Sequence, residues 1–285
     1  MKVVRATADA SGVYACVQAG GMGRGSIVHI DPGGSVDALV DAPDVGALAT
    51  DDASVYWVGA DGLHATSKKS PAARALASRS FGADARDAWS APTLALDADY
   101  IYFAGGGNVE RVAKRGGAAE TIESGRPGAA VVAVDGANVY WLLGTSTRDL
   151  YATPKAGGAA KRVARGLANL IAVAVDDTDV YWIADTHSAH RGSLQSVAKR
   201  GGEATTLVDD VPTFYAATLV AAGQDLYWLD YPGGLQAPMR VRTVPKHGGT
   251  PDTLATPFPT ANELFVDDAR VYWAEQGVFA VTRPH

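Results

Sequence analysis

A short histidine-containing segment, 184–192, carries the side chains best suited to metal chemistry. Asp185, His187 and His190 supply one carboxylate and two imidazoles within six positions. Ligands of these types at this spacing are compatible with a zinc or copper site. The alternative is that all three are solvated hairpin residues, because nothing in the sequence fixes their geometry. Both interpretations stay open.

Two further segments combine carboxylates with aromatic rings. Asp209 and Tyr215 belong to residues 208–215, whereas Asp230 and Tyr231 open the segment 230–236. Carboxylates beside aromatic side chains suit a polar ligand that carries a ring. We therefore expect these residues and the histidine segment to form the best candidate pocket of the chain.

The segment 78–92 holds the one tryptophan that stands outside the repeat described next. Trp89 and Arg86 lie in a stretch of charged and small residues. An off-pattern tryptophan in a charged loop can stack on a ligand or anchor an interface. It can also pack over the strands as a staple of its own loop, and the sequence leaves both roles open.

An internal repeat determines the elements that must position these segments. The run Val132–Trp141, VAVDGANVYW, returns as Val173–Trp182, VAVDDTDVYW, and five other copies keep the tyrosine. The steps between successive tyrosines are 38 to 46 residues, for Tyr14, Tyr56, Tyr102, Tyr140, Tyr181, Tyr227 and Tyr272. Seven copies account for the whole chain, which predicts a single domain over residues 1–285.

Each copy predicts four β-strands. The small-apolar triplet before the aspartate forms the first, and the Val-Tyr-Trp run, rich in β-branched and aromatic residues, forms the second. The third ends at a Lys-x-Gly-Gly turn, whose glycines supply positive φ angles, and a short fourth follows. Four antiparallel strands per ~40 residues is typical of a propeller blade. The sequence therefore predicts an all-β fold, a seven-bladed β-propeller of four-stranded antiparallel blades.

The two ends of the chain are expected to complete one blade together. The last copy stops without its fourth strand near Phe279, and Val3-Val4 precedes the first copy. Pairing these segments would remove an exposed sheet edge. We therefore predict that the N- and C-terminal strands pair and close the ring.

The pattern hydrophobic-Ala-Val-Asp, Val-Tyr-Trp, Pro-Lys-x-Gly-Gly resembles the YWTD/NHL-like bacterial propeller repeats, often found in secreted proteins and lipoproteins of myxobacteria and their relatives. The resemblance covers essentially the whole chain, and it implies the propeller fold and an extracytoplasmic location. It implies no catalytic residue, because the shared residues build blades. The Thr-Asp of YWTD is not kept, since Val58-Gly59 follows Trp57 and Ile183-Ala184 follows Trp182. This departure argues against a receptor-like role.

The charged residues of the repeat have structural interpretations that we favour. The motif aspartates could form a ring of cation ligands, but each is placed to cap its own turn by accepting backbone N–H bonds. The motif lysines could form a basic ring, but on solvated hairpin tips they are expected to balance the aspartates. These residues are Asp9, Asp51, Asp97, Asp135, Asp176 and Asp267, with Lys114, Lys155, Lys199 and Lys246.

The composition excludes several classes of protein. The 31 acidic residues exceed the 25 Lys and Arg, and the formal net charge of −6 argues against a nucleic-acid binder. One cysteine, Cys16, rules out an intrachain disulfide and is typical of a buried small apolar residue. The sequence contains no run of 18 apolar residues, so it predicts no membrane span. The first ten residues lack the apolar stretch of a signal peptide, so the residues alone leave the compartment open.

The repeat contains no catalytic motif, which favours a non-enzymatic binding module. Its variable loops would gather on one propeller face and hold a protein, peptide or carbohydrate partner. The alternative is a propeller enzyme, a lyase or a metal-dependent hydrolase, that uses the loops of blades five and six. A binding module is expected to need no cofactor. The enzyme would hold a divalent metal (zinc, copper or calcium) on the histidine segment. We expect the chain to be a monomer.

Overall fold

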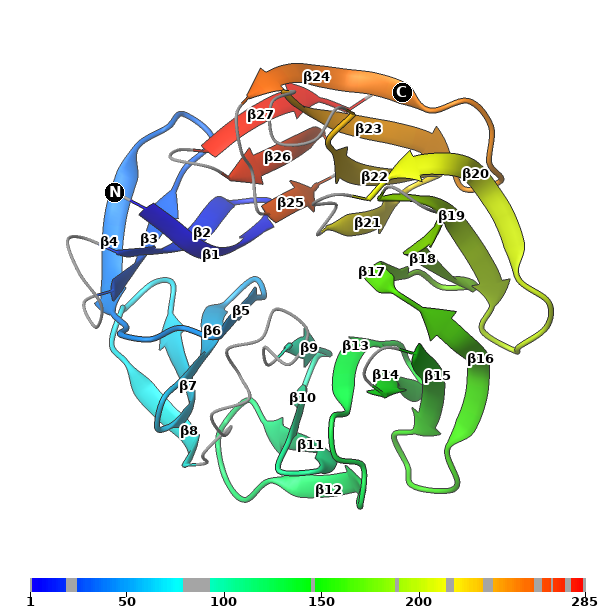
Figure 1. Cartoon of the computed structure of the whole chain (residues 1–285). Helices are drawn as coiled ribbons and strands as arrows, with labels where there is room; N and C mark the ends of the chain where they lie inside the picture. The colour runs from blue at the N-terminus through cyan, green and yellow to red at the C-terminus, as the bar shows by residue number, and fades with distance from the viewer. Residues whose placement is uncertain are drawn as a thin grey trace. The chain divides into compact units, whose positions relative to one another are not determined.

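The computed structural model describes residues 2–18, 25–78, 93–144, 147–187, 190–213, 218–232, 238–258, 263–267, 269–274 and 278–283. Every regular element in these ranges is a β-strand, and the strands form seven antiparallel sheets in chain order (Figure 1). Six sheets have four strands, and the last has three among the described residues. One sheet per repeat confirms the prediction of an all-β, seven-bladed β-propeller. Within the described ranges, no helix is long and apolar enough to cross a membrane.

Blades one to four contain the first sixteen strands. Blade one comprises β1 (Lys2–Asp9), β2 (Gly12–Gln18), β3 (Gly25–Ile30) and β4 (Val36–Asp41). Blade two comprises β5 (Ala47–Thr50), β6 (Ser54–Gly59), β7 (Gly62–Ser67) and β8 (Arg74–Ser78). Blade three comprises β9 (Ala95–Leu96), β10 (Tyr100–Gly105), β11 (Asn108–Ala113) and β12 (Glu120–Glu123). Blade four comprises β13 (Ala130–Val134), β14 (Asn138–Gly144), β15 (Thr147–Pro154) and β16 (Lys161–Ala168).

Blades five to seven contain the remaining strands. Blade five comprises β17 (Leu170–Val175), β18 (Asp179–His187), β19 (Arg191–Ala198) and β20 (Thr205–Pro212). Blade six comprises β21 (Leu219–Ala222), β22 (Asp225–Asp230), β23 (Met239–Pro245) and β24 (Asp252–Phe258). Blade seven comprises β25 (Glu263–Val266), β26 (Arg270–Ala274) and β27 (Val278–Thr282).

The chain divides into two compact units. The first comprises Met1–Leu143, Ala152–Lys161 and Gln276–Val278, and the second comprises Gly144–Tyr151, Arg162–Glu275 and Phe279–His285. Blades five and six, which carry most of the candidate site residues, belong wholly to the second unit. That the 285 residues form a single domain stays a prediction.

The repeated aromatic residues fill the space between adjacent blades. Side chains alternate along a strand, so the Tyr and the Trp of one Val-Tyr-Trp run face opposite neighbours. Tyr181 of blade five lies in one buried cluster with Trp228 of blade six. Tyr227 of blade six lies in another with Trp273 of blade seven. The motif therefore encodes packing between blades.

The Lys-x-Gly-Gly turns have the predicted backbone. In blade three, Gly116 and Gly117 have φ angles of 92° and 133°, in the region that favours glycine. The amide of Gly116 closes the turn by donating to the carbonyl of Ala113 at 2.8 Å. Corresponding bonds close the turns of blades four, five and six. The glycines thus serve turn geometry.

The predicted pairing of the chain ends is wrong. Val3 pairs with Val17 of β2, so the N-terminal residues prolong the first strand of blade one. The final strand, β27, is instead the third strand of blade seven and pairs with β26. The physical reason is strand length: the eight-residue β1 continues its ladder along the seven-residue β2, with a bulge between Val3 and Arg5. A continued ladder satisfies the backbone groups of the N-terminal segment locally.

Cys16 is a core residue, as predicted. Its side chain lies in a buried cluster with Tyr14, Ile27 and Trp57. Burial raises the pKa of the thiol to about 11, which keeps it protonated and unreactive at neutral pH.

Candidate functional site

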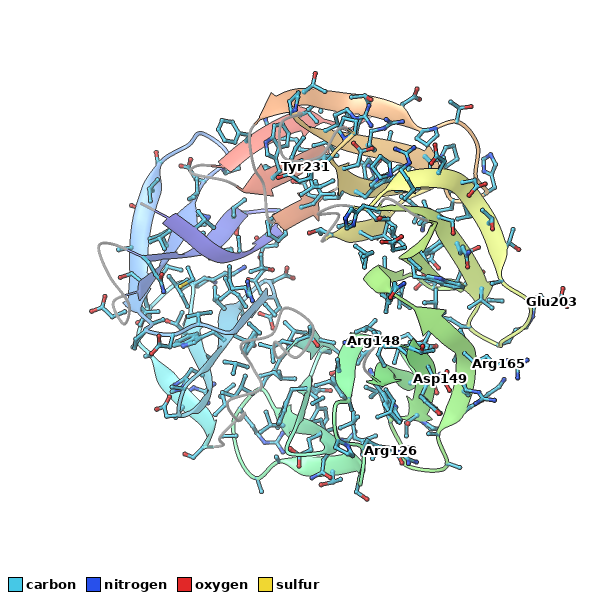
Figure 2. All side chains as sticks on the ribbon, in the orientation of Figure 1. Arg126, Arg148, Asp149, Arg165, Glu203 and Tyr231 are labelled. Atoms are coloured by element: carbon cyan, nitrogen blue, oxygen red, sulfur yellow. The ribbon has the colours of Figure 1, made fainter. Side chains whose placement is uncertain are left out.

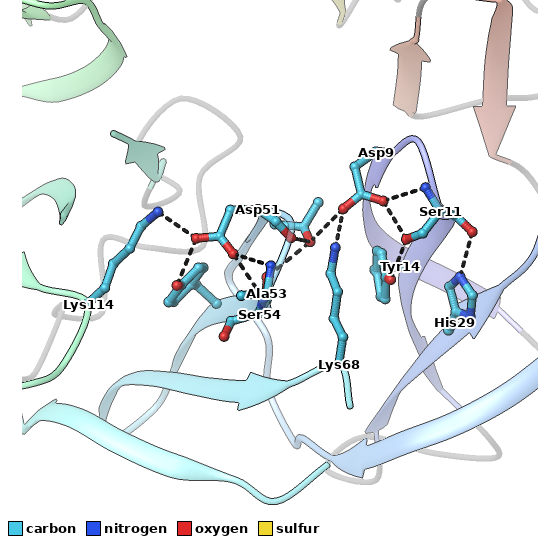
Figure 3. Close-up of polar contacts among 11 residues, drawn as sticks. Asp9, Ser11, Tyr14, His29, Asp51, Ala53, Ser54, Lys68 and Lys114 are labelled. Atoms are coloured by element: carbon cyan, nitrogen blue, oxygen red, sulfur yellow. Dashed lines mark hydrogen bonds and ion pairs between the residues drawn. The ribbon is translucent and has the colours of Figure 1, made fainter. Parts of the chain in front are cut away.

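The motif aspartates build the turn end of the blades. Oδ1 of Asp51 accepts hydrogen bonds from the backbone amides of Ala53 and Ser54, both at 2.9 Å, as predicted for a turn cap. Oδ2 of Asp51 accepts the hydroxyl of Tyr56 at 2.9 Å and the ammonium of Lys114 from blade three (Figure 3). We call this arrangement a Tyr–Asp–Lys bridge, with Tyr and Asp from one blade and Lys from the next.

The bridge recurs within both units. Lys155 of blade four reaches Asp97 of blade three, and Lys246 of blade six reaches Asp176 of blade five, each at 2.6 Å. Lys68 of blade two likewise pairs with Asp9 of blade one (Figure 3). The pairs confirm that Lys114, Lys155 and Lys246 balance aspartates, and the same role for Lys199 stays a prediction.

The lysines are not on solvated tips, which corrects the sequence-based expectation. The side chains of Lys68, Lys114, Lys155 and Lys246 are only 11 to 20% exposed. Each crosses to the preceding blade and places its ammonium 4.4 to 6.0 Å from a tyrosine ring centroid. Contact with the neighbouring ring and carboxylate removes these long side chains from solvent.

Hydrogen bonding determines the charge state of the bridge. Burial by itself would raise the pKa of Asp97, but hydrogen bonds from Lys155, Tyr102 and two backbone amides lower it to about 2. Burial and the hydrogen bond to Asp51 raise the pKa of Tyr56 to about 12. The aspartate is therefore charged and the tyrosine neutral throughout the physiological range.

Blade six departs from the bridge. Ala222 occupies the position of the motif aspartate, and the Tyr227 hydroxyl instead donates to Oδ2 of Asp225 at 3.4 Å. Arg283 of blade seven donates from Nε to the Tyr227 hydroxyl at 3.0 Å and from Nη1 to the Asp267 carbonyl at 3.2 Å. The link between these two blades is kept by different residues, which is the behaviour of a structural contact.

A hollow of about 440 Å³ lies at the turn end between blades five and six. The bridge residues Asp176, Tyr181 and Lys246 line it together with polar turn residues such as Thr178 and His247. The charged groups of the bridge already bond to one another there, so this hollow belongs to the repeated structural end of the blades.

A smaller cleft of about 190 Å³ lies at the opposite end of the same two blades. Asp209 and Asp230, both candidates from the sequence, line it, and so does Arg191 at the start of β19. The other lining residues are Val208, Asp210, Val211, Pro212, Trp228, Pro232, Arg240, Arg242 and Pro251. We call this site the blade five–six cleft. The structure therefore brings together part of the pocket expected from sequence.

A buried carboxylate organises the cleft. The side chain of Asp230 is 2% exposed and accepts two hydrogen bonds from Arg240, from Nε at 2.7 Å and from Nη2 at 2.9 Å. Nη1 of Arg242 lies 3.7 Å from the same carboxylate. The two arginines follow from register, because Arg240 pairs with Asp230 and Arg242 pairs with Trp228 across β22 and β23. Alternation then places all four side chains on one face of blade six.

Arg191 and Asp210 form the exposed edge of the cleft. Oδ1 of Asp210 accepts from Nε of Arg191 at 2.5 Å, and the Asp210 carbonyl accepts from Nη2 at 2.7 Å. The side chain of Asp210 is 69% exposed, in contrast to Asp230. This pair shows how the cleft holds a carboxylate on a guanidinium group.

The histidine segment lies beside the cleft residues in sequence, but its metal role stays a prediction. His190 occupies a left-handed turn position with φ 58°, and its Nδ1 lies 4.0 Å from Oδ2 of Asp185. The backbone of His187 ends β18, whereas its side chain lies outside the described residues. Among the described residues, no group of three His, Cys, Asp or Glu could hold a metal ion.

The other sequence candidates have separate outcomes. Tyr231 (labelled in Figure 2) is buried in the cluster shared with blade seven, next to Leu229 and Met239. Strand alternation turns it away from the face that carries Asp230, and its role in ligand binding stays a prediction. Arg86, Trp89 and Tyr215 lie outside the described residues.

Sequence reasoning missed the arginines of the cleft. Arg240 and Arg242 occupy positions that are Ser193 and Gln195 in blade five. The sequence did carry a signal for them: at the same distances before the motif lysine, blade six has two arginines where blade five has two uncharged residues. Register across β22 and β23 was needed to connect them with Asp230.

No protein-family model matches the chain, and no curated protein matches it in sequence. Solved structures are similar to it in fold. The β-propeller domain of the trilobed protease from Pyrococcus furiosus, described as having an open velcro topology, has a TM-score of 0.70 at 10% identity, over 98% of this chain and 94% of that one. A nidogen/laminin complex structure has a TM-score of 0.56 at 16% identity, over 79% and 86%.

A puromycin-hydrolyzing peptidase of Mycobacterium tuberculosis has a TM-score of 0.72 at 15% identity, over 98% of this chain. The chain spans 50% of the length of that peptidase. At these identities the likenesses show the β-propeller fold, which known proteins use both in complexes and as part of peptidases. The closer resemblance to YWTD/NHL-like bacterial repeats stays a prediction.

Proposed function

We propose that this protein is a non-enzymatic binding module that holds a peptide segment of a protein partner at the blade five–six cleft. The observation that carries the proposal is the concentration of off-pattern charged residues there. Asp230, Arg240 and Arg242 are absent from the corresponding positions of blade five, which are Ala184, Ser193 and Gln195. Charged side chains that the repeat does not require, on a rigid scaffold, are typical of recognition.

The lining of the cleft supports binding over catalysis. Its polar side chains are arginines and aspartates, and none of its described lining residues is Ser, Cys, Thr, Lys or His. A nucleophile with an adjacent base would be needed for acyl transfer. The buried carboxylate, Asp230, is engaged by Arg240 and so is held in place as an ionic anchor.

The dimensions of the cleft support a peptide as the ligand. Sites for drug-sized molecules usually measure about 300–1,000 Å³, whereas this cleft measures about 190 Å³. It accommodates a side chain or a chain end, with the remainder of a peptide lying over the neighbouring loops. The resemblance to extracytoplasmic repeat proteins supports a secreted or surface-exposed partner.

An array of immobilised peptides and glycans, probed with the labelled full chain, tests the proposal. We expect a subset of peptides to retain the wild-type protein. The same peptides are expected to retain at least tenfold less of the Arg191→Gln variant. Arg162→Gln is the matched control, because Arg162 pairs at 3.3 Å with Asp149 of blade four (Figure 2), outside the cleft. Retention only on glycans, equal retention of both variants, or cleavage of the bound peptides would overturn the proposal.

A further inference from the structure

Trp228 contributes a buried polar group to the blade five–six cleft. Its side chain is 1% exposed, and its indole Nε1 is buried with no hydrogen-bond partner among the described residues. A buried donor without an acceptor destabilises the fold, because it has lost its hydrogen bond to water and gained none in return. Trp228 lines the blade five–six cleft, and because its Nε1 is shielded from solvent, a ligand seated there would supply the missing acceptor only with a small movement of the indole ring.

Comparison with blade four shows how this state arises. The indole Nε1 of Trp141 donates to Oγ1 of Thr153 at 3.0 Å, within the same blade. The residue at the corresponding place before the motif lysine of blade six is Val244, which has no acceptor. Blade six therefore keeps the tryptophan of the repeat without the internal acceptor available in blade four.

The arginines of the cleft also leave donors available. The bonds of Arg191 and Arg240 to the described residues use Nε and Nη2, and Nη1 of each has no acceptor there. Arg242 donates from Nε and Nη2 to the carbonyls of Asp252 and Pro251, while its Nη1 is 3.7 Å from Asp230. Each guanidinium carries five N–H donors and no acceptor. The unused groups are therefore N–H donors, and they require oxygen acceptors.

The charge balance and the apolar walls of the cleft restrict the class of ligand further. Three arginines and three aspartates line the cleft, so its formal charge is balanced. A singly charged carboxylate meets less repulsion there than a dianionic phosphate would. Val208, Val211 and the prolines of the lining provide an apolar wall beside these donors.

We infer that the blade five–six cleft binds the C-terminal carboxylate of a peptide whose last residue is apolar. This inference rests on the proposed function and names the part of the peptide that is recognised. The carboxylate oxygens accept from Trp228 Nε1 and from the free Nη1 groups, and the terminal side chain packs on the valine and proline wall. The hydrogen bond from Arg191 to the Asp210 carboxylate is an example, within the cleft, of the same guanidinium–carboxylate contact.

The test uses N-acetyl-Gly-Gly-Leu and its C-terminal amide as probes of the full chain. The six tryptophans give six indole N–H signals in a ¹H–¹⁵N spectrum, and Trp228→Phe identifies one of them. We expect the acid to move the Trp228 signal downfield and the amide to bind at least tenfold more weakly. Arg191→Gln is expected to lower the affinity for the peptide acid at least tenfold, whereas Arg162→Gln leaves this affinity unchanged.

A second measurement keeps the test valid if Trp228→Phe fails to fold. Fluorescence polarisation of the labelled acid and amide peptides compares their affinities in the wild type, Arg191→Gln and Arg162→Gln alone. Equal affinity for acid and amide overturns the inference while the proposed function stands. Binding of array-selected internal peptides without binding of either tripeptide has the same meaning. A shift of the Trp228 signal by inorganic phosphate that matches the tripeptide shift would make the cleft a general anion site and also overturn it. Failure of every peptide in both experiments overturns the proposed function as well.

Discussion

The two ends of blades five and six use charged residues in different ways. At the turn end, Lys246 crosses to Asp176 at 2.6 Å and repeats a bridge found in other blades. At the cleft end, Asp230 is bound by Arg240 at 2.7 Å, and blade five has Ala184 and Ser193 in the corresponding positions. The same strand, β22, reaches from one end to the other.

This difference teaches how a repeat protein divides its residues between stability and recognition. The ion pair of the bridge recurs in four pairs of neighbouring blades, and blade six keeps its link to blade seven through Arg283 even without the aspartate. Under the proposed function, the cleft residues occur once because a ligand needs only one site. An ionic group that departs from the repeat and leaves buried donors is thus a better guide to function than one that recurs.

The largest expected effect on stability concerns the buried carboxylate of the cleft. Asp230→Ala leaves two partly buried guanidinium groups without their carboxylate, so we expect a loss of about 3–5 kcal/mol in the free energy of unfolding. Urea unfolding of the full chain measures it. Asp209→Ala, the exposed carboxylate of the same cleft, is the control: it removes a hydrogen bond from the Asp210 amide and is expected to change stability by no more than about 1 kcal/mol. Equal small effects would show that Asp230 is not an anchor.

The next prediction measures a bridge. Asp97→Ala removes the turn cap, the acceptor for Tyr102 and the partner of Lys155. We expect a loss of about 2–3 kcal/mol in the free energy of unfolding. Asp99→Ala is the matched control in the same turn, because Asp99 is exposed and its main-chain carbonyl contact with Lys114 remains. A loss no larger than that of Asp99→Ala would contradict the structural role of the bridge.

Acid should weaken the bridge in a defined range of pH. The folded pKa of Asp97 is about 2, below the ordinary value of 3.8. The charged carboxylate therefore contributes stability above about pH 4, and this contribution is lost as the pH falls from about 4 through 2. We expect urea unfolding at pH 6, 4 and 2 to show a shallower decline in Asp97→Asn than in the wild type. Identical slopes would count against the bonds assigned to Asp97.

The smallest effect concerns the tyrosine of the bridge. Tyr56→Phe removes one hydrogen bond to Asp51, and we expect a loss of about 1 kcal/mol at neutral pH. The folded pKa of Tyr56 is about 12, above the ordinary 10.0. Its neutral hydroxyl therefore stabilises the fold fully below pH 10, and this stabilisation disappears as the pH rises through 12. Absorbance at 295 nm should show one fewer late-titrating tyrosine in Tyr56→Phe. An unchanged alkaline titration would assign the late group elsewhere.

Much of the fold follows from the sequence because its information is local and repeated. Alternation within the Val-Tyr-Trp runs, the capping aspartates and the glycine turns each act over a few residues, and seven copies reinforce one interpretation. The same local logic correctly placed Cys16 in the core and the aspartates in their turns. It failed at the N-terminus, because two β-capable segments, β2 and β27, were both available to Val3, and the β1–β2 ladder determined which one pairs.

The candidate site depended on tertiary structure to a greater extent. The sequence by itself indicated Asp209 and Asp230 as off-pattern carboxylates in blades five and six, and both line one cleft. It did not connect Arg191, Arg240 and Arg242 with them, because cross-strand register and packing between blades decide which side chains share a face. It placed Tyr231 beside Asp230 although alternation buries the two on opposite faces of blade six. The unpaired indole of Trp228 depends on the same long-range packing: a local pattern specifies the tryptophan, but only the folded blade determines whether an acceptor is within reach.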